Sequence, residues 1–109
     1  MKLLINGIDV NGRDIGLRAH SDTINQKSLA ANTAERDTIP TGAKRVVISA
    51  TANVWVLLGS SGVTAANTGD VSDGSASELN PSGYLLDGSA THISVISDAT
   101  CLVTLSYYA

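Results

Sequence analysis

Residues 44–59, KRVVISATANVWVLLG, decide the fold. They form the longest apolar run in the chain, and the run is interrupted only at Thr51-Ala52-Asn53. On both sides of this break apolar residues occupy every second position, and many of them are β-branched, which is typical of strands. The sequence therefore predicts an antiparallel hairpin, with strands at 46–51 and 54–58, at the centre of a two-layer β fold.

Apolar residues also fall on the second faces of the predicted strands. Val47 and Leu57 do so in the hairpin, and Ile96 does so in the later segment HISVIS at 92–97. Side chains on the second face of a strand need cover as well. We expect Val47, Leu57 and Ile96 to contribute either to the second layer or to a subunit interface.

The composition favours a small all-β domain. The 109 residues include no Phe, one Trp and three Tyr, whereas Ser, Thr, Gly and Asn together account for 40. Such a chain favours short strands and many turns over long helices, and its 43% hydrophobic content is too high for a disordered chain. About seven to nine strands are predicted, forming an antiparallel β-sandwich or a jelly-roll-like barrel.

We interpret the N-terminal third of the chain as a segment distinct from the rest. Asn6-Gly7, between residues 3–5 and 8–10, favours a tight hairpin turn, and Asn11-Gly12 favours a second turn. Residues 1–37 are therefore predicted to be a β meander, or an arm that anchors the chain or pairs with a neighbouring subunit. Residues 38–109 are predicted to be the sandwich core of what is a single domain overall.

Two other stretches depart from the alternating pattern of the predicted strands. Residues 21–34 could begin a helix, but their large apolar residues are poorly spaced for one, so we predict a loop and then a strand at 27–32. Residues 60–77 are almost wholly small and polar, which predicts a long surface loop. The remaining predicted strands are 15–20, 83–86, 92–97 and 101–107.

The sequence contains no convincing pattern of catalytic or metal-binding residues, and we predict no enzymatic activity, no metal site and no cofactor. Cys101 lies in an apolar strand pattern, where a free thiol is usually a buried hydrophobe, and His20 and His92 are far apart. No pair of His or Cys has metal-ligand spacing. Residues 70–75 resemble a calcium loop, but Asn80 stands where the bidentate Glu belongs.

The few aromatic residues allow two interpretations. Trp55 and Tyr84 could stack on sugar rings, or they could pack against the core with their polar atoms in water. Tyr107 and Tyr108 could do the same, or could form an intersubunit contact, since Tyr is enriched at interfaces.

Charge is unevenly distributed along the chain. All seven basic residues lie in the first 45 positions, which carry a net charge of +2, whereas residues 46–109 carry five acids and no base. This asymmetry indicates either an end that docks on an acidic partner or a solvated surface. The acidic chain is a poor candidate for binding nucleic acid, and no apolar stretch approaches the length of a membrane span.

The compartment is predicted from the cysteine count and the first residues. The single Cys101 excludes an intrachain disulfide framework and fits a reducing cytosol. The start, MKLLINGIDVNG, has an apolar run too short for a signal-peptide core. We expect the protein to stay in the compartment where it is made.

From about residue 38 onward the order of segments resembles small bacteriophage virion proteins of the head-decoration or capsid-stabilising type, and related small tail or fibre components. The segments are IPTG at 39–42 leading into KRVVI at 44–48, VWVLLG at 54–59 running into SGVTA at 61–65, LNPSG at 79–83, THISVIS at 91–97 and LVTLS at 102–106.

This resemblance implies a β-sandwich or jelly-roll unit in a virion, made in the cytoplasm of a host bacterium. It implies self-association, with a trimer favoured, and binding to the major capsid protein or another virion protein. The alternative is a carbohydrate- or receptor-binding module of a tail or fibre. The interface residues that we predict are Arg13, Arg18, Val47, Leu57, Ile96, Tyr107 and Tyr108.

Overall fold

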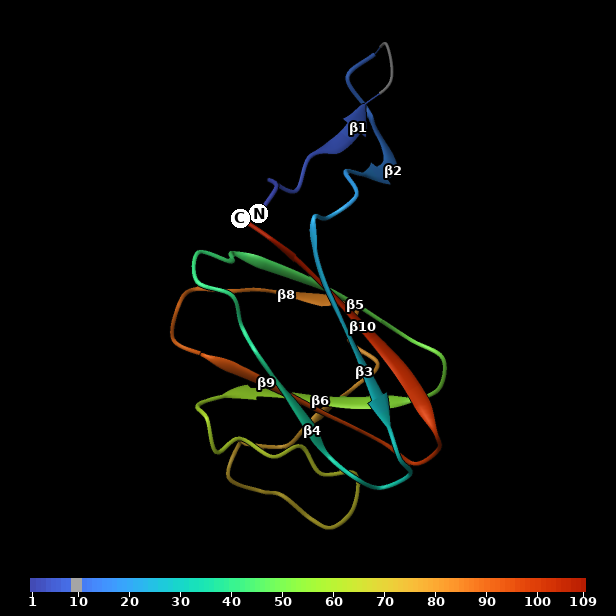
Figure 1. Ribbon diagram of the computed structural model, residues 1–109, viewed down its shortest axis with the longest axis vertical. Helices are drawn as coiled ribbons and strands as arrows, with labels where there is room; N and C mark the ends of the chain where they lie inside the picture. Colours follow the sequence, from blue (N-terminus) through green and yellow to red (C-terminus); the bar gives the residue numbers. More distant parts are fainter. Residues whose placement is uncertain (9–10) are drawn as a thin grey trace.

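The computed structural model describes residues 1–8 and 11–109 and contains only strands, turns and loops in that part of the chain (Figure 1). All strand pairs are antiparallel. The strands are β1 (Asn6–Ile8), β2 (Asp14–Arg18), β3 (Thr23–Leu29), β4 (Glu35–Thr38), β5 (Arg45–Ala50), β6 (Val54–Gly59), β7 (Glu78–Leu79), β8 (Gly83–Leu85), β9 (His92–Ser97) and β10 (Cys101–Tyr108).

Eight of these strands form two four-stranded sheets that pack face to face. One sheet has the order β3-β10-β5-β8 and the other β4-β9-β6-β7. Most consecutive strands are divided between the layers: β3 and β4, β5 and β6, β7 and β8, and β9 and β10 each lie in opposite sheets, whereas β6 and β7 are neighbours in one sheet. This is the strand order of a double-sheet jelly roll. The predicted all-β sandwich is confirmed, and its sheets do not close into a barrel.

The predicted central hairpin is wrong, although both of its strands exist. β5 pairs with β10 and β8, whereas β6 pairs with β9 and β7 in the other layer. Residues 51–53 therefore carry the chain from one sheet to the other instead of turning it back on its neighbour. Alternation predicted correctly which side chains face inward, because Val46, Ile48, Val54 and Val56 are all buried.

The core lies between the two sheets, and β10 lies at its centre. The inward row of β10, which is Cys101, Val103, Leu105 and Tyr107, is almost completely buried. Aliphatic side chains of the neighbouring strands in the same sheet (Leu29, Val46 and Ile48) and of the opposite sheet (Val54, Val56, Ile93 and Val95) complete this core. With no Phe available, close packing of β-branched side chains supplies most of the apolar burial.

One polar cluster joins the two layers at the edge where β3 and β4 face each other. The carboxylate of Asp37 on β4 accepts hydrogen bonds from the Tyr107 hydroxyl at 2.7 Å and from the Asn25 amide at 2.9 Å. The Lys27 ammonium lies 3.5 Å from the same carboxylate. Burial raises the pKa of the Tyr107 hydroxyl, and the hydrogen bond with Asp37 and the charge of Asp37 raise it further. The Tyr107 hydroxyl therefore remains a donor to the carboxylate.

The N-terminal region differs from its prediction in two ways. Asn6-Gly7 lies within β1 instead of forming a turn, and the chain reverses before β2, where Gly12 has a φ of +78°. The predicted strand at 8–10 lies partly outside the described residues. β3 and β4 belong to the sandwich sheets, so only β1 and β2 stand outside them and the predicted division at 37/38 does not separate arm from core.

The interlayer cluster predicts a stability cost for removing one hydroxyl. Tyr107→Phe leaves the buried Asp37 carboxylate with one donor fewer, and we expect it to lower the free energy of unfolding by about 1–3 kcal/mol. Chemical denaturation monitored by Trp55 fluorescence measures the change.

Tyr84→Phe is the matched control. The Tyr84 hydroxyl donates to Glu78 at the surface, so its removal should change stability by no more than about 0.5 kcal/mol. Equal effects of the two substitutions would contradict the role of the Asp37 cluster.

Candidate functional site

The hairpin of β1 and β2 projects from one end of the sandwich, and we call residues 1–8 and 11–20 the arm (Figure 1). Tyr108 holds its base. The Tyr108 hydroxyl donates to the carbonyl oxygen of Ala19 at 2.7 Å and accepts a hydrogen bond from Arg18 Nε at 3.2 Å. Tyr108 is fully buried by these contacts and by the outer face of its own sheet. The base of the arm is therefore attached to the most central strand of the fold.

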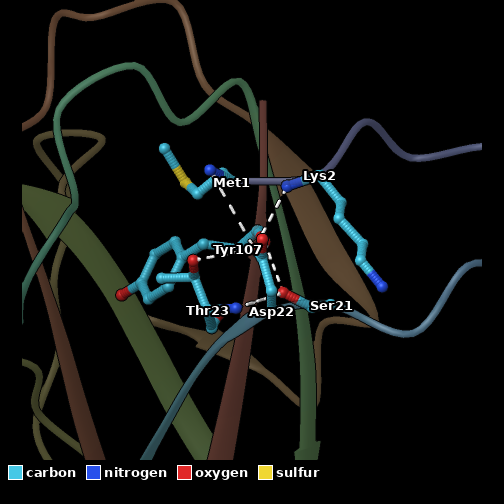
Figure 2. A network of polar contacts seen from close by, with 6 residues as sticks. All are labelled: Met1, Lys2, Ser21, Asp22, Thr23 and Tyr107. Carbon is cyan, nitrogen blue, oxygen red and sulfur yellow. Dashed lines mark hydrogen bonds and ion pairs between the residues drawn. The ribbon is translucent and has the colours of Figure 1, made fainter.

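A second set of contacts fastens the start of the chain beside its end (Figure 2). The backbone N–H of Lys2 donates to the Asp22 carboxylate at 3.1 Å, and the carbonyl oxygen of Lys2 accepts from Ala109 N–H at 2.9 Å. Below them the buried Ser21 hydroxyl donates to the Tyr107 carbonyl oxygen at 2.6 Å and accepts from Thr23 N–H at 3.0 Å. These contacts position the arm relative to the sandwich.

The arm has two different faces. Arg18 points to Tyr108, so its neighbour Leu17 points away, because successive strand residues alternate. Leu4 is half-buried against β5 and β8, whereas its neighbours Leu3 and Ile5 are exposed. Leu3, Ile5 and Leu17 are 61%, 62% and 65% exposed. Exposed aliphatic side chains on a projecting segment are typical of a surface that binds something else.

At the opposite end of the sandwich, residues 60–77 form the predicted long loop and cover the outer face of the β4-β9-β6-β7 sheet. Ala65 is buried, and its N–H donates to the Ser94 hydroxyl at 2.8 Å. The Arg36 guanidinium donates to the Val63 carbonyl oxygen and to the Thr64 hydroxyl. These contacts hold the first part of the loop against the sheet.

Between this loop and β6 lies an open groove of about 660 Å³. Trp55 and Leu57 project into it from the outer face of β6, and both are half-buried. The loop contributes Asp70 and Val71, of which Val71 is 44% exposed. The groove therefore combines an apolar floor with a polar rim that includes one acid, Asp70.

The structure places the predicted interface residues in several different regions. Arg13 and Arg18 are exposed on the arm, and Val47 is half-buried on the outer face of its sheet. Leu57 lines the groove, and Ile96 is buried on the outer face of β9. Tyr107 and Tyr108 are buried within the chain. Of these, Arg18 and Tyr108 come into direct contact.

The apolar face of the arm was not predicted from the sequence. Its signal was present in the alternation of Leu3 and Ile5 and in the position of Leu17 within a predicted strand. An exposed apolar face and a buried one give the same pattern, which is why the sequence did not distinguish them.

The residues considered for catalysis or metal binding lie in separate environments. Cys101 is buried, and its sulfur lies 3.7 Å from the Thr51 hydroxyl, whereas His20 is exposed at the end of the arm. His92 contacts the hydroxyl of its neighbour Thr91. Within residues 1–8 and 11–109, no three His, Cys, Asp or Glu side chains are grouped to hold a metal ion, and no helix could cross a membrane.

The calcium-like segment 70–75 contains a local turn that occupies its acid. The Asp73 carboxylate accepts hydrogen bonds from the Ser75 hydroxyl at 2.6 Å and from the Ser75 N–H at 3.1 Å, and these bonds lower the pKa of the carboxyl group. Asp87 and Ser89 repeat the arrangement after β8, with the same Asp-Gly-Ser sequence. Both segments are self-contained turns with a charged, exposed side chain.

Comparison of the chain with protein-family models, with curated proteins and with solved structures found no match. The site is therefore interpreted from its own geometry.

The attachment of the arm can be tested at Tyr108. Tyr108→Phe removes the donor to Ala19 and the acceptor for Arg18, and we expect the arm to loosen while the sandwich stays folded. Trypsin cleavage after Arg18 should accelerate several-fold, because cleavage follows the population of locally opened chains. Tyr84→Phe serves as the control, and an unchanged cleavage rate in Tyr108→Phe would show that Tyr108 does not hold the arm.

Proposed function

We propose that this protein is a non-enzymatic structural component of a bacteriophage particle, of the head-decoration or capsid-stabilising kind. It acts by associating with copies of itself and by binding the shell. The observation that carries the proposal is the arm, since it presents an apolar face made of Leu3, Ile5 and Leu17 on a segment attached to a compact sandwich. Uncovered apolar surface of this kind marks an interaction site.

The strand order and the order of sequence segments support the same proposal. Jelly rolls occur in viral capsid and lectin domains, among others, so the fold is compatible with a virion protein without requiring one. The resemblance of residues 38–109 to small virion proteins favours this use of the fold over the others.

The physical effect of such a protein follows from linkage. A protein that binds the assembled shell and not its separated subunits stabilises the shell by mass action. Single copies can bind weakly, because an oligomer that contacts several shell subunits at once gains by avidity. We propose a homo-oligomer, with a trimer favoured, and the major capsid protein or another virion protein as the partner.

The proposal predicts a stable homo-oligomer in solution and binding to intact shells. Light scattering should give a mass at least twice the 11.2 kDa of one chain, and the protein should co-sediment with purified shells in a saturable manner. A strictly monomeric protein that remains in the supernatant with shells would contradict the proposal.

A carbohydrate- or receptor-binding module is a second candidate, and the groove favours it. Trp55 lines an open groove with polar loop residues around it, an arrangement suited to stacking on a sugar ring. This function predicts binding on a glycan array that disappears in Trp55→Ala. Binding should persist in Tyr84→Ala, because Tyr84 does not line this groove and its hydroxyl donates to Glu78.

A further inference from the structure

We propose that the arm of one copy docks in the groove between β6 and the 60–77 loop of a second copy, and that this contact is how the protein associates with itself. The inference rests on the proposed self-association and assigns it a site. It joins two features of the molecule described above, the exposed apolar face of the arm and the open groove with an apolar floor.

The arm and the groove both present apolar side chains. The arm offers three exposed aliphatic side chains, Leu3, Ile5 and Leu17. The groove offers Trp55 and Leu57 on its floor and Val71 at its side. Bringing these side chains together removes apolar surface from water on both copies, which is the main favourable contribution in most protein association.

The charges are complementary. Residues 1–20 carry three bases, Lys2, Arg13 and Arg18, and two acids. The 60–80 region carries Asp70, Asp73 and Glu78 and no base, and all three acids are exposed. Pairing the arm with the groove brings opposite charges together, whereas pairing two arms would bring like charges together, which opposes association.

The two surfaces lie at opposite ends of the long axis of the molecule, which measures 49 Å (Figure 1). The arm of a copy is thus far from the groove of that same copy and is available to another. A contact between two different surfaces is head-to-tail, so it generates a closed ring or an open chain of copies. A three-membered ring is the closed form that agrees with the trimer proposed above.

The test uses two exposed positions, so that neither substitution disturbs the core. Leu17→Asp removes an apolar side chain from the arm and adds a negative charge. Val71→Arg does the opposite at the groove, where the added cation faces a cationic arm. Each variant alone should self-associate roughly 10- to 100-fold more weakly than the unmodified protein, as measured by analytical ultracentrifugation.

Mixing the two variants distinguishes this contact from any symmetric one. The Leu17→Asp copy keeps an intact groove and the Val71→Arg copy keeps an intact arm, so an equimolar mixture should form a 1:1 dimer and nothing larger. A Val71→Arg protein that keeps its full oligomeric state would overturn the proposal in favour of an arm-to-arm contact.

Leu85→Asp is the matched control, because Leu85 is 81% exposed on β8, away from the groove. It should leave self-association unchanged. If Leu85→Asp dissociates the oligomer and Leu17→Asp does not, the docking site is overturned while the proposed structural role stands. If the unmodified protein is monomeric at all concentrations, the proposed self-association itself fails.

Discussion

Burial of the inward row of β10 is the constraint on which the rest of the structure depends. Val103, Leu105 and Tyr107 are completely inaccessible to solvent, and the same strand pairs with β3 on one side and β5 on the other. Tyr107 also reaches across to Asp37 in the opposite sheet. Its neighbour Tyr108 points outward and holds the arm. One strand thus organises a sheet, the contact between layers and the attachment of the projecting hairpin.

The sequence predicted the class of fold and most strand positions, because alternation records which face of a strand is buried. It failed on the partners of those strands. Residues 51–53 connect two apolar strands in a way that suits a tight hairpin as well as a crossing between layers. The choice is made by residues far away, since β10 pairs with β5 and β9 pairs with β6. The local alternation of apolar and polar residues does not indicate which distant strand is the pairing partner.

The charge of the candidate site was predictable from the sequence, whereas its three-dimensional shape was not. The basic bias of the first 45 residues and the polar character of residues 60–77 are visible in the sequence, and both features belong to the surfaces that we propose to meet. The anchoring role of Tyr108 depends on a hydrogen bond to a backbone atom 89 positions away in the chain. The groove depends on a loop that returns over its own sheet, held by Arg36.

The splitting of consecutive strands between the layers has a consequence for how the chain reaches its native state. Within the sandwich only β6 pairs with its immediate successor, β7, and every other strand has its successor in the opposite sheet. The sheet built on β3 and β5 lacks its middle member until residue 108 has left the ribosome. Folding of such a non-local topology is slow, because many loops must close before either sheet is complete. During synthesis the nascent chain exposes unpaired edges that invite aggregation, which makes chaperone protection valuable during production.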